Sequence, residues 1–194
     1  MQDEIASAVV AALKVKLLPS QVVSSPPLSV NAWLSNFYLG TGEFGLAQAS
    51  AARTVEIAPE HMGGLRNLVF AYVLQNRLPE ARAASHRAKD DGSSGSLVLM
   101  LGDALVEQGL GHEAESRRIA DEYAANPSSL GASYQIAEVF AWQGRTGRAF
   151  DWLGHAYDEH DAGLSYVKYD PFLSKLRGDP RYPALLKKLH LPLD

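Results

Sequence analysis

The feature of this sequence that most constrains its fold is a spacing of about 34 residues between similar short motifs. In each motif a residue typical of turns is followed five positions later by alanine. The pairs are Gly42 and Ala47, Asn76 and Ala81, Gly109 and Ala114, and Gly144 and Ala149. Successive alanines lie 34, 33 and 35 residues apart. A period of this length is typical of repeats that consist of two antiparallel helices.

Apolar side chains precede each turn residue at helical spacing. Four positions before the turn stand Tyr38, Tyr72, Leu105 and Phe140, and eight positions before it stand Leu34, Leu68, Leu101 and Ile136. Residues four apart share one face of a helix, so each motif predicts a first helix with an apolar face. No segment alternates apolar and polar residues between hairpin turns, so we expect no sheet.

The third and fourth motifs also carry a family resemblance. The third reads Leu101-Gly102, Leu105, Gly109 and Glu113-Ala114, and the fourth has Phe140, Gly144, Ala149 and Ala156. In this order the residues resemble the tetratricopeptide repeat (TPR) family, although the second motif turns at Asn76 instead of glycine. The resemblance implies an all-α, right-handed superhelical solenoid whose concave groove binds another protein or a peptide.

The repeats divide the chain into consecutive parts. We expect an N-terminal helix over residues 1–18, as the remnant of an upstream domain, and a linker rich in proline and serine over residues 19–27. Four repeats follow, at about residues 28–61, 62–94, 95–129 and 130–162. Residues 163–194 form the C-terminal helical cap that the last repeat needs, because it would otherwise expose its apolar face.

The two ends of the chain add a narrower resemblance. The segment from Tyr169 to Tyr182 resembles the end of the C-terminal repeat region of bacterial TolB-like/TPR signalling proteins, which include cyclase-like and winged-helix regulators. The segment from Gln2 to Lys14 is similar to the last helix of the TolB-like domain. This resemblance implies a regulatory role as part of a larger protein. It also leaves an alternative open, in which the chain is the ligand-sensing part of such a regulator.

Composition and charge limit the classes of partner and the cellular location that we expect for this protein. The formal net charge of −4 argues against a nucleic-acid partner, because such proteins usually carry a basic surface. The longest apolar stretch, residues 5–18, contains Lys14 and Lys16 and is too short to span a membrane. The absence of cysteine and of a secretory leader is compatible with a cytoplasmic protein.

We find no pattern of catalytic, metal-binding or cofactor-binding residues. The run from Gly40 to Gly45 matches a dinucleotide fingerprint in its letters, but helical spacing precedes it where that site needs a strand. His155 and His160 are five residues apart, whereas a helical metal pair needs a spacing of three or four. We therefore expect a protein that is not an enzyme and that binds no cofactor.

The inner faces of the first helices supply the candidate binding residues. They are Asn36, Arg66, Asn67, Phe70, Asp103, Tyr134 and Glu138. The hypothesis is that apolar residues of a partner anchor in this groove while its basic residues meet Asp103 and Glu138. The alternative is that Phe70, Tyr134 and Trp142 simply pack between repeats.

The N-terminal helix is a second candidate interface. Its apolar residues cover much of its circumference: Ile5, Val9, Val10, Leu13, Leu17 and Leu18. Such a helix is not stable alone in water. It either folds back on the first repeat, which we favour, or forms a homodimer with the same helix of another subunit.

Overall fold

The computed structural model describes residues 28–90, 97–125 and 132–193, and within these ranges it contains helices and no strand. The α-helices are α2 (Leu28–Thr41), α3 (Phe44–Ile57), α4 (Met62–Leu74), α5 (Leu78–Asp90), α6 (Leu97–Gly109), α7 (Glu113–Ala124), α8 (Ser133–Trp142), α9 (Thr146–Asp158) and α10 (Arg181–Lys188). Two 3-10 helices, η2 (Ala162–Tyr166) and η3 (Ser174–Leu176), lie between α9 and α10. The prediction of an all-α fold is confirmed for this part of the chain. The expected N-terminal helix, its linker and the homodimer contact fall outside the described residues.

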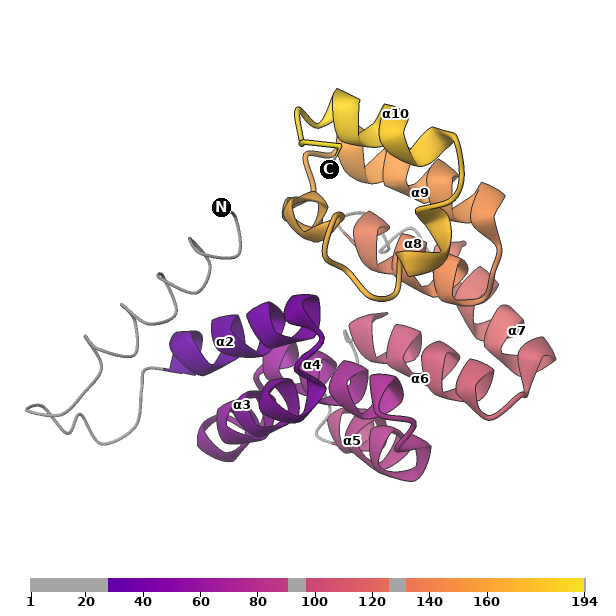
Figure 1. The fold of residues 1–194 in the computed structure, drawn as a ribbon. Coiled ribbons are helices and arrows are strands. Elements are labelled where there is room, and N and C mark those ends of the chain that lie inside the picture. The colour runs from indigo at the N-terminus through magenta and orange to yellow at the C-terminus, as the bar shows by residue number, and fades with distance from the viewer. Residues whose placement is uncertain (1–27, 91–96, 126–131, 194) are drawn as a thin grey trace, which may run out of the picture.

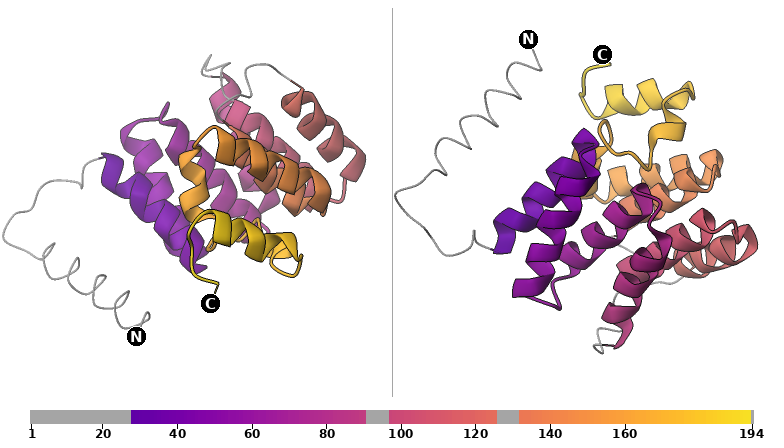
Figure 2. Two further views of the ribbon diagram at one scale, coloured as in Figure 1. Left: turned by 90° about the horizontal axis from the view of Figure 1, so that it is seen from above. Right: turned by 60° about the horizontal axis from the view of Figure 1, so that its bottom comes forward.

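Consecutive helices pair, and the pairs stack in chain order (Figure 1). The pairs are α2 with α3, α4 with α5, α6 with α7, and α8 with α9. Neighbouring pairs also touch through their first helices, since α2 contacts α4, α4 contacts α6 and α6 contacts α8. The views in Figure 2 show the same succession from other sides. We call α2, α4, α6 and α8 the first-helix row. None of the described helices has the length and apolar character needed to cross a membrane.

The turn inside each pair has one recurring geometry. A residue with a left-handed backbone ends the first helix, and these residues are Gly42, Asn76, Gly111 and Gly144, with φ of 80°, 56°, 80° and 73°. The next residue donates its backbone N–H to the carbonyl five positions earlier, at 2.8–2.9 Å in all four turns. This arrangement satisfies carbonyl groups that a helix end leaves unpaired, and glycine adopts it without strain.

The predicted turn of the third pair was wrong by two residues. Gly109 is the last residue of α6, and the left-handed turn residue is Gly111. Ala114 is exposed, whereas Ser116, five positions after Gly111, is fully buried. The error arose because glycine occupies both positions, and counting residues cannot tell which of them has the left-handed backbone.

Small residues let the two helices of a pair approach closely. In the first pair the Ser35 hydroxyl donates to the Ala47 carbonyl at 3.1 Å. In the third pair the direction is reversed, because the Ser116 hydroxyl donates to the Ala104 carbonyl at 2.6 Å. All four residues are fully buried. Ala104 is therefore the small residue of α6 at the contact with α7.

The glycine-rich run from Gly40 to Gly45 lies at the corner between α2 and α3. A helix precedes it, and Gly42 is the left-handed residue of the turn. Its interpretation as a turn is confirmed.

The C-terminal segment, residues 162–193, covers two different surfaces. Its last helix, α10, lies along α9 at the end of the stack (Figure 1). The Arg181 guanidinium lies 4.3 Å from the centre of the Phe150 ring, and the Lys188 ammonium lies 3.6 Å from the centre of the Tyr157 ring. Cations over aromatic faces stabilise such a contact.

The earlier part of the C-terminal segment turns back onto the first-helix row. Phe172, only 1% exposed, packs against Phe70 of α4 and Trp142 of α8, with ring centres 4.7 and 5.3 Å apart. Tyr169 passes so close to Gly40 of α2 that a Cβ added there would lie 3.3 Å from the Tyr169 Cβ. The cap predicted for residues 163–194 thus also occupies part of the expected groove.

The packing of α4 on α3 generates a prediction. A Cβ added at Gly64 would lie 2.7 Å from the Thr54 Cγ2, which is buried, whereas one added at Gly154 of α9 would meet no atom within 4 Å. We expect Gly64→Ala to lower the free energy of unfolding by about 1–2 kcal/mol through overpacking. Gly154→Ala should raise it by about 0.4–1 kcal/mol, because alanine restricts the unfolded chain. Urea titration measures the free energy of unfolding of both variants. An equal increase in the two variants would contradict the close contact between Gly64 and Thr54.

Candidate functional site

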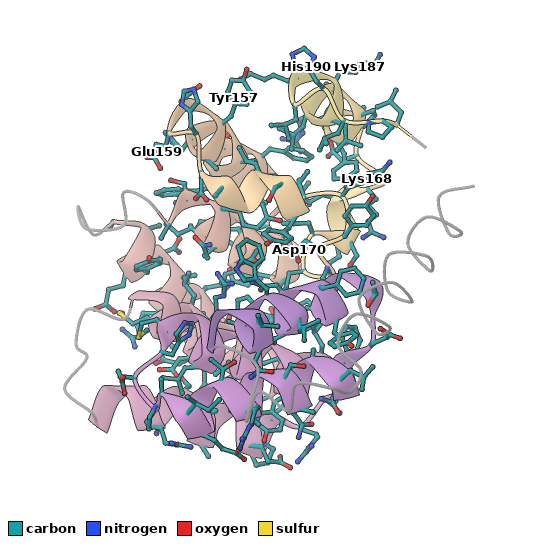
Figure 3. The ribbon with its side chains drawn as sticks, turned by 90° about the vertical axis from the view of Figure 1, so that its left-hand side faces the viewer. Tyr157, Glu159, Lys168, Asp170, Lys187 and His190 are labelled. Carbon is teal, nitrogen blue, oxygen red and sulfur yellow. The ribbon has the colours of Figure 1, made fainter. Side chains whose placement is uncertain are left out.

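A cavity of about 300 Å³ lies between the first-helix row and the C-terminal segment. Helices α2, α4 and α8 form its walls, together with residues that follow α9. The lining residues are Trp33, Asn36, Leu39, Gly40, Arg66, Phe70, Tyr134, Gln135, Glu138, Asp161, Ala162, Gly163, Tyr166, Tyr169, Asp170, Pro171 and Phe172. Figure 3 shows Asp170 of the C-terminal segment where this segment faces the helices of the first half of the chain.

Five of the seven predicted groove residues line this cavity: Asn36, Arg66, Phe70, Tyr134 and Glu138. Two do not. Asn67 is fully buried and donates its side-chain amide to the Ala32 carbonyl at 3.3 Å, so it joins α4 to α2. Asp103 accepts a hydrogen bond from the Ser85 hydroxyl of α5 and does not line the cavity.

The C-terminal segment contributes cavity residues that the sequence analysis assigned only to a cap. They include Tyr166, Tyr169 and Asp170. Asp161, which the sequence analysis placed in the fourth repeat, also lines the cavity. The available sign was the density of aromatic residues from Tyr166 to Phe172. No repeat spacing connects these positions with the first helices, so the sequence pattern could not bring them together.

Two buried carboxyl groups meet inside the cavity wall. Asp170 is held at both oxygens, because the Tyr134 hydroxyl donates to its Oδ2 and the Phe172 backbone N–H to its Oδ1, each at 2.8 Å. Glu138 is 7% exposed, and its Oε2 is buried with no hydrogen-bond partner among the described residues. Other groups therefore hold Asp170 in place.

The surroundings of the two carboxyl groups affect their pKa values differently. Burial raises the pKa of Glu138 well above 4.5, and the neighbouring Asp170 raises it further. Burial also raises the pKa of Asp170, but hydrogen bonds from Glu138, Tyr134 and the Phe172 N–H, with the charge of Arg66, oppose that rise. Because more donors stabilise the ionised form of Asp170, the shared proton belongs on Glu138.

Arg66 carries the positive charge of the cavity wall. Its guanidinium donates to the amide oxygens of Asn36 and Asn67, each at 3.2 Å, and lies 5.8 Å from the centre of the Phe70 ring. Among the described residues, no carboxylate lies within ion-pair distance of it. Two side-chain amides thus orient this cation.

Aromatic side chains form the mouth of the cavity. Trp33 on α2 is 65% exposed and Tyr169 on the C-terminal segment is 60% exposed. Large aromatic residues this open to solvent are typical of surfaces that contact another molecule. The arrangement suits binding, with an apolar entrance and hydrogen-bonding groups at its base. In the described part of the chain, no group of three histidine, aspartate or glutamate side chains has the geometry to hold a metal ion.

Comparisons with models of protein families, with curated proteins and with solved structures give no match to this chain. The properties of the site therefore come from its own geometry.

The buried carboxyl pair predicts how stability depends on pH. Above about pH 4.5 the unfolded chain releases a proton that Glu138 keeps in the folded protein, so the unfolded state gains stability as pH rises toward the raised pKa. Glutamine at this position cannot ionise. We expect the stability of Glu138→Gln relative to the unsubstituted protein to increase with pH above 4.5, by at most about 1.4 kcal/mol per pH unit. Urea titrations of both proteins from pH 4 to 8 test this, and a difference independent of pH would contradict it.

The docking of the C-terminal segment gives a further prediction. Removal of the buried Phe172 ring in Phe172→Ala should cost about 3–5 kcal/mol of unfolding free energy, the usual loss for a buried phenylalanine. Leu193→Ala, at an exposed position of the same segment, is the control and should change stability little. Denaturant titration gives the free energies. A loss no larger than that of the control would mean that the segment does not pack on the first-helix row.

Proposed function

We propose that this protein is a TPR-type interaction scaffold that binds a segment of a partner protein at the first-helix row. The recurring turns, the buried small residues and the stacking of four helix pairs support this assignment. Stacked helix pairs expose a continuous surface made by one helix of each pair, and repeat proteins use such surfaces for binding.

The observation that carries the proposal is the open aromatic mouth of the cavity. Trp33 lies on α2 and Tyr169 on the C-terminal segment, both line the cavity, and both remain exposed. Tryptophan and tyrosine are the residues that most often dominate binding energy at protein interfaces. A partner side chain that packs on these rings would bury apolar surface.

The chain's own C-terminal segment illustrates the chemistry that this groove accepts. Its Phe172 ring packs between Phe70 and Trp142, and the Lys175 ammonium donates to the Trp142 carbonyl at 2.6 Å. The same ammonium lies 5.5 Å from the centre of the Trp142 ring. A partner segment with aromatic and basic residues would use the same kinds of contact on the adjacent, uncovered part of the row.

The resemblance of the chain ends to TolB-like/TPR signalling proteins favours a regulatory role within the cytoplasm. In this setting the repeats would connect an upstream domain to its partner. Asp103 lies outside the cavity, so this proposal does not use it as an acidic contact for the partner.

One observation favours a second function, that of a sensor for a small ligand. The cavity of about 300 Å³ is lined by a few polar groups, among them Arg66, Glu138 and Asp170, and small-molecule sites are concave spaces of this order with few polar groups. A ligand that binds only the folded state raises the melting temperature, so a thermal-shift screen separates this function from peptide binding.

The proposal predicts the effect of mutations at the cavity mouth. Peptides selected from a display library for binding to the unsubstituted protein should bind Trp33→Ala and Tyr169→Ala at least tenfold more weakly, or by about 1.4 kcal/mol or more. Leu46→Ala, at an exposed leucine of α3 that is not part of the cavity, is the matched control. Fluorescence titration gives the affinities. Equal binding by the three variants would place the interaction elsewhere.

A further inference from the structure

The first helix pair carries most of the exposed apolar surface in the described part of the chain. Seven large apolar side chains are exposed there, and four of them lie on α2 and α3. These four are Trp33, Phe37, Leu46 and Ile57. Exposed apolar side chains that cluster in this way are typical of a surface that another segment or molecule covers.

Helix α2 has a neighbouring pair on one side only. It packs chiefly against its partner α3 and against α4, the first helix of the next pair. By contrast, α4 and α6 each contact a first helix on both sides. Trp33 and Phe37 are four residues apart, so they lie on one face of α2, and they are 65% and 43% exposed. An end face of this kind in a stack of helix pairs needs a cap.

The other end of the stack shows how this protein covers such a face. There, α10 lies along α9 (Figure 1). Two residues of α10 four positions apart, Tyr182 and Leu186, are buried. Arg181 and Lys188 of the same helix lie over the aromatic rings of α9, as described above. The C-terminal cap is thus an apolar helix face with cations beside it.

Residues 5–18 have the sequence pattern of a matching cap. Three large apolar residues recur every four positions and would share one face of a helix. They are Val9, Leu13 and Leu17. On the same helix Lys14 and Lys16 would lie on either side of this face, where they could contact aromatic rings as Arg181 and Lys188 do.

The lengths of the two segments also match. Residues 5–18 number 14, as many as α2 contains, so each would span about 21 Å as a helix. Residues 19–27 join them, and nine residues reach up to about 30 Å when extended. Packed helices lie only about 8–10 Å apart, so this linker is long enough to bring the segment back along α2.

We propose that residues 5–18 pack along α2 of the same chain, over Phe37 and over the part of Trp33 that does not line the cavity, as the N-terminal cap of the stack. Phe37 is not among the residues that line the cavity, so the inference does not depend on the proposed function. The short linker favours this contact over the same contact from a second copy, because it keeps the segment at a high effective concentration beside α2.

Hydroxyl-radical footprinting of the full chain, read by mass spectrometry, measures the accessibility of single side chains and tests the proposal. Val9→Asp/Leu13→Asp places charge on the apolar face of the segment. Ala8→Asp/Ala11→Asp is the matched control, because it adds the same charge on the opposite face of the same helix.

We expect Phe37 to be oxidised several-fold faster in Val9→Asp/Leu13→Asp than in the unsubstituted protein, because the segment no longer covers it. Trp33 should change in the same direction, and the control variant should match the unsubstituted protein at both residues. Leu110, which is exposed between α6 and α7, is the internal reference and should react equally in all three proteins.

The absence of native cysteine allows a second test on the full chain. Phe37→Cys is combined in turn with Val9→Cys, Leu13→Cys and Leu17→Cys, and we expect at least one pair to form a disulfide within a monomer under mild oxidation. Equal oxidation of Phe37 in the two aspartate variants would overturn the inference. Failure of all three cysteine pairs to close, or disulfides that join only two chains, would also overturn it.

Discussion

Close contact between the two helices of each pair is the constraint on which the rest of this structure depends. Fully buried small residues at the crossing, such as Ser35 with Ala47 and Ala104 with Ser116, bring the backbones within reach of a side-chain hydroxyl. The left-handed turn then returns the chain in the opposite direction. Because this unit repeats, each pair presents the same face to the next, and the first helices form one row.

The second determinant is the path of the chain after the last pair. If residues 162–176 continued away from the stack, the first-helix row would be an open surface. Instead Phe172 is buried between α4 and α8, and the segment closes one side of a cavity. The protein's own C-terminal segment thus covers part of the first-helix row. Trp33 of α2, beside the covered part, remains exposed.

The chemistry of the cavity follows from that closure. Away from the C-terminal segment, Glu138 would be an ordinary glutamate on a helix surface. Burial beside Asp170 raises its pKa and leaves one of its oxygens without a donor. Buried carboxyl groups of this kind reduce stability at neutral pH, so their presence at a cavity with an aromatic mouth favours a role in binding over a role in folding.

The sequence by itself determined the helices, their pairing and three of the four turns, because these depend on periodic apolar residues and on local backbone preferences. It placed five cavity residues on the inner faces of the first helices, but misplaced the third turn where Gly109 and Gly111 compete. Only the tertiary structure decided that Asp170 meets Glu138 and that Asp103 turns toward Ser85. The physical reason is that the chain between α9 and α10 has 3-10 turns and no α-helix, so burial of Phe172, rather than any local pattern, sets its position.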